Sequence, residues 1–294
     1  MGSFWDPLQN PTLFAAPFFL LFIGIELAAY RFLETDEGER GYDARDARTS
    51  LLMGLGSVVF LTAFKLATLV VFVAVSVHLA PWHLPTDTWW YWVLLMVVID
   101  LAYYCNHRFV HRVRIGWAAH QAHHSSEFFN FTTALRQKWN PWSEFLFWLP
   151  FPLLGFAPWT LYVAFSFNLI YQFFVHTERI DKLPRPVEYV LNTPSHHRVH
   201  HGSDPLYLDR NYAGILIVWD RMFGSFQPEV HRPTYGLLKV VDTYNPLRLE
   251  YGEYVQMVRD VRSTPRWRDK LGYVFAPPGW KPEGTGDAAD VSAR

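Results

Sequence analysis

The stretch WWYWVLLMVVIDLAYYCNHRFVHRVRIGWAAHQAHH, residues 89–124, decides how this chain folds. Its first half is apolar and aromatic, which predicts a membrane-spanning helix, and it continues without a break into histidines. His107 and His111 are four residues apart, so a helix places both imidazoles on one face. Three further imidazoles follow at spacings of three and four: His120, His123 and His124. The stretch therefore predicts a spanning helix that ends in a group of metal-ligating side chains.

A second triplet with the same spacing lies further along the chain, in HRVHH: His197, His200 and His201. With His176, nine imidazoles are candidate metal ligands. Nine imidazoles are more than one metal ion can bind. They suit two ions, each with coordination positions left for oxygen or substrate. Imidazole binds iron, zinc, copper and nickel, so ligand type does not choose the metal. A structural zinc site would use four ligands, and this number favours two ions with open positions.

Two more apolar runs, at residues 13–32 and 51–80, precede the stretch 89–124. Each is long enough to cross about 30 Å of hydrocarbon at roughly 1.5 Å per residue. The turn between the second and third runs, 81–88, is flanked by tryptophans, as expected at a membrane interface. We therefore expect three spanning helices.

A fourth apolar region, 143–174, is interrupted by Pro150, Pro152, Gly155 and Pro158. It predicts a re-entrant helical hairpin, because the histidines before and after it must meet at one site. The predicted fold class is an all-α membrane protein with about three spanning helices, this hairpin and a cytoplasmic histidine-rich cap. Residues 1–275 would form a single domain, with the catalytic region at about 95–230. We expect a disordered tail at 276–294, which is rich in Gly, Pro, Asp and Ala.

The distribution of basic residues predicts the orientation of this multi-pass protein. The loops opposite the histidines, 1–11 and 81–88, contain no Lys or Arg. The histidine side holds six arginines: Arg40, Arg45, Arg48, Arg108, Arg112 and Arg114. The positive-inside rule then puts the histidines in the cytoplasm, in a bacterial inner membrane or the endoplasmic reticulum.

Composition excludes several other classes of protein. The net charge of −1 offers no basic field for nucleic acid. Cys105 is the only cysteine, which rules out a disulfide framework or a cysteine-based cluster within one chain. The sequence carries no Gly-rich dinucleotide fingerprint and no haem-attachment motif. Electrons for redox chemistry must therefore come from a separate protein or a diffusible reductant.

Several residues are expected to support the ligands. Glu127 and Glu178 are candidate carboxylate partners for ligand imidazoles, and His196 stands beside the second triplet on another helical face. Asp100 lies two turns before His107, where it would either hydrogen-bond a ligand histidine or pair with Lys65. A lipid pocket is expected beneath the histidines, lined by aromatic side chains: Phe147, Trp148, Tyr162, Phe165 and Tyr171.

The order HxxxH, HxxHH and HxxHH resembles the fatty acid hydroxylase and sterol desaturase superfamily. HQAHHSSEFFNFTTALRQ (120–137), LNTPSHHRVHHG (191–202) and DRNYAGILIVWDRMFGSF (209–226) look closest to its ether-lipid-cleaving alkylglycerol monooxygenases. The resemblance implies two irons, O2 as co-substrate, oxidation of a lipid C–H bond, and tetrahydrobiopterin as a candidate reductant. It also implies that Asp209, Asn211 and Tyr212 brace the last histidine triplet.

A different class, a metal transporter or sensor without redox chemistry, remains as the alternative. A transporter should carry metal-binding side chains through its spans. Here the candidate ligands are confined to one side, and the spans offer little beyond Lys65 and Asp100. The pattern favours a lipid oxygenase or desaturase.

Overall fold

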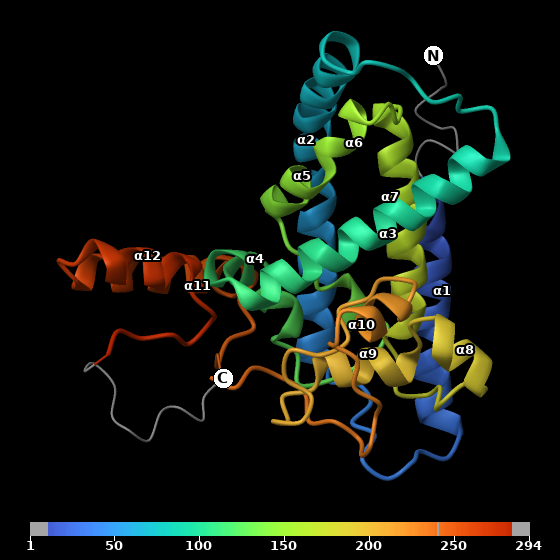
Figure 1. Cartoon of the computed structure of the whole chain (residues 1–294). Helices are drawn as coiled ribbons and strands as arrows, with labels where there is room; N and C mark the ends of the chain where they lie inside the picture. Colours follow the sequence, from blue (N-terminus) through green and yellow to red (C-terminus); the bar gives the residue numbers. More distant parts are fainter. Residues whose placement is uncertain (1–10, 240, 284–294) are drawn as a thin grey trace.

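The computed structural model describes residues 11–239 and 241–283, shown in Figure 1. These residues form helices and loops with two isolated β-bridges, which confirms the predicted all-α class. The helices in chain order are α1 (Pro11–Phe32), α2 (Ala44–His78), α3 (Trp89–Arg112), α4 (Arg114–His124), the 3-10 turn η1 (Thr133–Leu135), α5 (Trp142–Trp148), α6 (Pro150–Leu153), α7 (Pro158–Val175), α8 (Arg185–Val190), α9 (Pro194–His201), α10 (Val218–Met222), α11 (Pro246–Ser263) and α12 (Trp267–Phe275).

Three helices, α1, α2 and α3, are long and apolar enough to cross a membrane, as predicted. α2 begins at Ala44, earlier than the apolar run indicated, because the Asp43 side chain caps it by accepting from the backbone N–H groups of Arg45 and Asp46. Its 35 residues span roughly 52 Å, well over the hydrocarbon thickness of about 30 Å. The first turns of α2 therefore extend beyond the hydrocarbon on the histidine side.

The predicted hairpin corresponds to α5, α6 and α7, which rise and return beside α2 and α3 (Figure 1). Its tip lies against the α2–α3 loop, where the Leu84 N–H donates to the Gly155 carbonyl at 2.9 Å. Gly155 has a φ of 88°, and a Cβ there would approach Trp82 to 2.7 Å, so the tip requires glycine. The hairpin thus extends from the histidine side to the loop that joins the second and third spans. Its entry into the bilayer remains a prediction.

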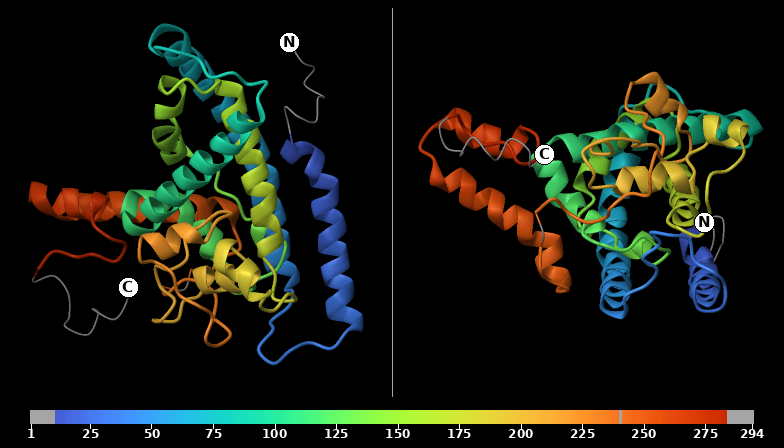
Figure 2. Two further views of the ribbon diagram at one scale, coloured as in Figure 1. Left: turned by 45° about the vertical axis from the view of Figure 1, so that its right-hand side comes forward. Right: turned by 90° about the horizontal axis from the view of Figure 1, so that it is seen from below.

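The remaining helices lie at one end of the bundle or beside it. α8, α9 and α10 gather at the end where α1 and α2 are joined, while α11 and α12 project sideways (Figures 1 and 2). The tail predicted at 276–294 lies mostly outside the described residues. Within the described part, Trp280 packs on Tyr273 with ring centroids 5.5 Å apart. Residues 284–294 lie outside the described part of the chain.

Candidate metal centre

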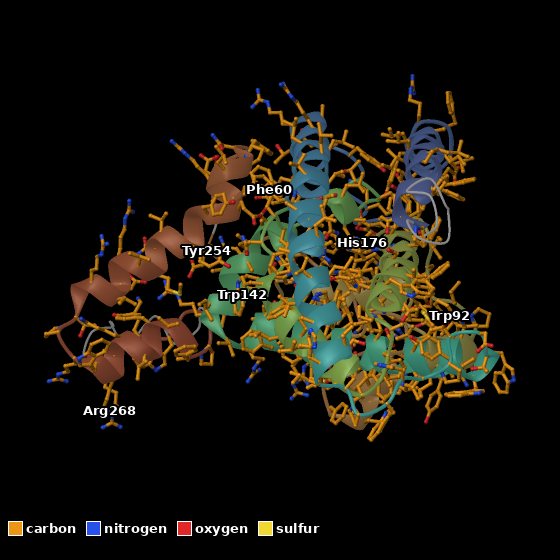
Figure 3. The ribbon with its side chains drawn as sticks, turned by 90° about the horizontal axis from the view of Figure 1, so that it is seen from above. Phe60, Trp92, Trp142, His176, Tyr254 and Arg268 are labelled. Carbon is orange, nitrogen blue, oxygen red and sulfur yellow. The ribbon has the colours of Figure 1, made fainter. Side chains whose placement is uncertain are left out.

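Nine buried histidines converge from four segments of the chain. α3 contributes two, α4 and α9 contribute three each, and His176 directly follows the last residue of α7. None of the nine is more than 8% exposed. Figure 3 labels His176, which lies inside the bundle rather than on its rim. The structure therefore brings together all nine histidines that the sequence singled out.

The nine imidazoles form two adjoining groups, and the ligand atoms within each group lie within 4.8 Å of one another. The five-histidine group contains His107, His111, His120, His124 and His200, and the four-histidine group contains His123, His176, His197 and His201. Each HxxHH triplet is divided between them. In α4 the first and last histidines join the five-histidine group, whereas in α9 they join the four-histidine group. Each triplet therefore serves both groups.

Backbone carbonyls orient four of the rings. The Nδ1–H groups donate to carbonyl oxygens at these distances: His107 to Tyr212 at 2.8 Å, His123 to Arg136 at 3.3 Å, His176 to Gln172 at 2.7 Å and His200 to Arg210 at 3.0 Å. An Nδ1 that carries the proton leaves Nε2 with a free lone pair, the form that binds metals. These carbonyls therefore select the ligand tautomer.

The inward-facing nitrogens fit a bound cation. The Nε2 atoms of His123 and His176 are 3.3 Å apart, although both rings carry their proton on Nδ1. Two lone pairs at this distance repel each other unless a positive ion lies between or beside them. Among the described residues, the buried Nε2 atoms of His111, His200 and His201 also lack a hydrogen-bond partner. Such unpaired buried atoms are costly in a native protein and are explained by metal coordination.

The pKa values of the clustered histidines favour the neutral imidazoles that bind metal. Burial lowers the pKa of His176 to about 3 and that of His200 to about 4. Burial, followed by repulsion from neighbouring imidazoles, also lowers the pKa values of His120 and His124. At physiological pH these rings are neutral, as metal coordination requires.

The stretch after α9 supplies two of the orienting carbonyls. Asp209 and Asn211 both adopt left-handed φ values, 60° and 53°, so the chain turns sharply on either side of Arg210. The Asn211 amide donates to the His196 carbonyl at 3.1 Å, which joins this stretch to α9. Asp209 instead accepts from Arg112 at 3.0 Å. The expected bracing of the last triplet thus comes from Asn211 and from the carbonyl of Arg210.

Two buried carboxylates hold the chain beyond Tyr212. Asp220 accepts from the backbone N–H groups of Tyr212 and Ala213 at 2.8 and 2.9 Å. Asp100 accepts from those of Ile215 and Leu216 at 2.8 and 3.0 Å. Asp100 therefore acts on the loop that orients His107, and neither expected partner, a ligand histidine or Lys65, was correct. Sequence reasoning missed Asp220 entirely, although an acidic residue in the apolar GILIVWD stretch was a signal.

The structure corrects two other expected supports, Glu127 and Glu178, and places His196 on another helical face from the ligands, as expected. Glu127 is exposed and pairs with Arg40 at 3.6 Å. Glu178 accepts from the Arg40 N–H at 2.9 Å and from the Tyr235 hydroxyl at 3.1 Å. Neither carboxylate is bonded to a ligand imidazole, because both side chains point toward the residue 40 segment. His196 Nε2 lies 3.0 Å from a Glu188 carboxylate oxygen and is outside both histidine groups.

An aromatic gap opens between α2, α5 and α7. Trp148, Tyr162 and Phe165 line it, as expected, together with Lys65 and Glu144. Phe165 lies 6.3 Å from the Tyr103 ring, whose centroid is 5.0 Å from that of His107. The gap is thus separated from the histidines by one aromatic layer.

The other two expected pocket residues lie elsewhere. Phe147 packs on Phe109 at 5.7 Å, and the Tyr171 hydroxyl donates to the Asn192 carbonyl at 2.6 Å. Both side chains contact other segments of the chain and do not line the gap.

A helical membrane protein with two adjoining buried histidine groups is the class that this fold and site define. Residues 92–225 match the family described as fatty acid hydroxylase, the family that the histidine motifs resemble. No solved structure shows significant similarity to the chain.

Among curated proteins, the chain is similar to alkylglycerol monooxygenases. That of Xenopus tropicalis is 42% identical over 239 residues, which cover 81% of this chain and 53% of the relative. That of Homo sapiens is 38% identical over 91% of this chain and 59% of the relative. Ornithine lipid hydroxylase OlsE of Rhizobium tropici is 27% identical over 142 residues, 46% of this chain and 41% of that protein. The chain spans about half the length of these relatives.

Proposed function

We propose that this protein is a membrane di-iron oxidoreductase that uses O2 to hydroxylate, cleave or desaturate a lipid chain. The observation that carries the proposal is the pair of adjoining histidine groups, with Nε2 lone pairs of His123 and His176 facing each other at 3.3 Å. Similarity to alkylglycerol monooxygenases and to a lipid hydroxylase supports a lipid substrate.

The five-histidine group would hold one iron and the four-histidine group the other. When bound, the iron pair supplies O2 activation and oxidising power toward an unactivated C–H bond. Five and four imidazoles leave positions free on each ion for oxygen and substrate. The chain's own contribution is to keep the rings neutral and fixed, and the burial of all nine excludes water. Tetrahydrobiopterin or an electron-transfer protein would supply the electrons.

The substrate tail would enter sideways through the aromatic gap between α2, α5 and α7. Apolar rings there match an acyl or alkyl chain, and Tyr103 separates the gap from His107. The polar head would stay at the membrane surface, which leaves the reacting carbon close to the head group. The arginines near the histidines, including Arg40 and Arg112, support a cytoplasmic position for this site.

The test combines metal analysis with lipidomics. Cells that produce the wild-type chain should gain an oxidised or unsaturated lipid that is missing from cells producing His123→Ala. The purified wild type should contain two irons per chain and consume O2 when that lipid and a reductant are added. A wild-type protein that holds iron but changes no lipid and consumes no O2 would contradict an oxygenase and leave metal storage or transport as the better reading.

A further inference from the structure

α11 uses one face to join the bundle. Its buried residues Leu249 and Met257 lie on that face. Glu253 and Asp260, on the same side, accept from the guanidinium of Arg114 on α4 at 2.7 and 2.5 Å. This face is therefore fully partnered by the protein itself.

The opposite side of α11 exposes an apolar stripe. Leu247, Tyr251, Val255 and Val258 follow one another at intervals of four, four and three residues, and they are 59%, 37%, 48% and 45% exposed. α12 repeats the pattern with Trp267, Leu271 and Phe275, which are 75%, 54% and 58% exposed. Residues at these intervals share one face of a helix. Two such stripes on neighbouring helices indicate an interaction surface rather than chance exposure.

The placement of the two helices indicates what covers the stripes. α11 and α12 lie across the direction of α1 and α2 (Figures 1 and 2), and Figure 3 shows Tyr254 and Arg268 on helices that extend away from the bundle. Helices that lie crosswise to the spans run along a membrane surface rather than through it.

Contacts with α2 set the depth of α11. The Thr49 hydroxyl donates to the Tyr244 carbonyl, two residues before α11, at 3.1 Å. Trp139 stacks on Phe60 at 5.0 Å and lies 6.4 Å from Tyr251. From Phe60 to the end of α2 at His78, the helix rises roughly 27 Å, close to the hydrocarbon thickness. α11 therefore lies where the polar boundary of the leaflet on the histidine side must be.

The exposed charge beside the stripes is positive. The exposed basic residues of this region are Arg248, Arg259, Arg262, Arg266 and Arg268. The acids on the two helices are engaged: Glu253 and Asp260 bind Arg114, Glu250 accepts from the Trp139 N–H at 2.8 Å, and Asp269 accepts from the Thr264 hydroxyl at 3.1 Å. Apolar stripes bordered by arginines match acyl chains bordered by anionic head groups.

We propose that α11 and α12 form an amphipathic hairpin that lies flat in the leaflet on the histidine side. Their apolar stripes insert among the acyl chains, and their arginines contact phosphates of anionic lipids. A lipid surface fits better than a second copy of the chain, because the stripes lie at the level where the lipid-facing surface of α2 ends. The proposal stands independently of the oxygenase function.

Nitroxide scanning of the full chain in lipid nanodiscs tests this directly. Cys105 is replaced by serine, and single cysteines are introduced as Val255→Cys on α11 and Leu271→Cys on α12. Gly252→Cys is the matched control, because Gly252 is exposed on α11 away from the stripe and a Cβ there would have no neighbour within 4 Å. Power saturation compares collisions with O2, which concentrates in lipid, and with water-soluble chromium oxalate.

In nanodiscs that contain phosphatidylglycerol, labels at 255 and 271 should favour O2 over chromium oxalate several-fold more than the label at 252. The difference should shrink in pure phosphatidylcholine, since the arginines then lose their anionic partners. Equal access of chromium oxalate to all three labels would overturn membrane docking. Dipolar broadening between labels at position 255 of two chains would overturn membrane docking and indicate contact between two copies. The same ratio of O2 to chromium oxalate collisions in both lipids would show that the arginines do not bind anionic head groups.

Discussion

At the scale of single residues, the centre depends on which nitrogen of each ring carries the proton. Carbonyls of Gln172 and Arg136 place it on Nδ1 of His176 and His123, so that both Nε2 atoms face inward. The two histidine groups differ in size, so the loss of one imidazole should weaken metal binding more in the smaller group. A four-histidine group reduced to three holds its ion less well than a five-histidine group reduced to four.

His123→Ala should lower the iron content from two per chain toward one, because it takes a ligand from the four-histidine group. His200→Ala should retain more metal yet lose activity, because the five-histidine group keeps four imidazoles in altered geometry. His231→Ala is the matched control, since that ring is half exposed and lies outside both groups. Metal analysis of the three purified variants checks this. Two irons retained in His123→Ala would contradict the assignment.

Metal-free protein should become less stable as the pH falls from 7 to 5. Unfolded imidazoles take up protons near pH 6.5, whereas burial lowers the pKa of His176 to about 3 and of His200 to about 4. Between these values the unfolded state binds more protons, so the free energy of unfolding drops by up to about 1.4 kcal/mol per pH unit for each such histidine. Thermal unfolding in detergent measures it, and His176→Gln should flatten the dependence. A midpoint that is the same at pH 7 and pH 5 would argue against buried neutral rings.

Asp220 shows how one carboxylate acts on a ligand without touching it. The two oxygens of Asp220 accept from the backbone N–H groups of Tyr212 and Ala213. In Asp220→Asn an amide NH2 replaces one of these oxygens, so that one backbone N–H faces another donor and loses its hydrogen bond. We expect a loss of about 1–3 kcal/mol in stability and a metal affinity lowered by roughly 10–100-fold, because the carbonyl that orients His107 shifts. Asp181→Asn, at an exposed position, is the control. Calorimetric metal titration should find this control unchanged. An unchanged affinity in Asp220→Asn would mean that His107 needs no such support.

At the scale of elements, α7 carries one position that lines the aromatic gap and another that lies wholly in the core. Leu169 is partly buried and lines the gap, whereas Ala164 on the same helix is fully buried in the core. The two positions therefore distinguish a blocked route from a damaged fold.

Leu169→Trp should reduce turnover of long-chain lipid with metal content retained, because the larger ring fills the gap. Ala164→Trp should instead destabilise the protein by about 1–3 kcal/mol through overpacking. Phe167→Trp, at a 45% exposed position of α7, is the control for an added indole. Turnover, iron content and thermal stability are measured on one preparation of each. Wild-type turnover in folded, iron-loaded Leu169→Trp would show that the substrate enters by another route.

At the scale of the whole molecule, we expect three spans and a hairpin to leave the two ends of the chain on opposite sides of the membrane. The hairpin returns to the histidine side, so it does not change the side of the segments that follow. A reporter fused at the C-terminus should read cytoplasmic, and one fused at the N-terminus should read external. Paired reporter fusions in intact cells check this, and two ends on the same side would contradict three spans.

The sequence by itself determined the features that depend on local spacing and length. Apolar runs of sufficient length indicated α1, α2 and α3, and intervals of three and four placed the histidines of each triplet on one helical face. Only the tertiary structure decided how the triplets divide between two groups and which carbonyls select the tautomers. It also revealed the roles of Asp100 and Asp220. The physical reason is that a helical interval is set by the backbone of one segment. The direction of a carbonyl or carboxylate relative to a ring far along the chain is set by how separate segments pack.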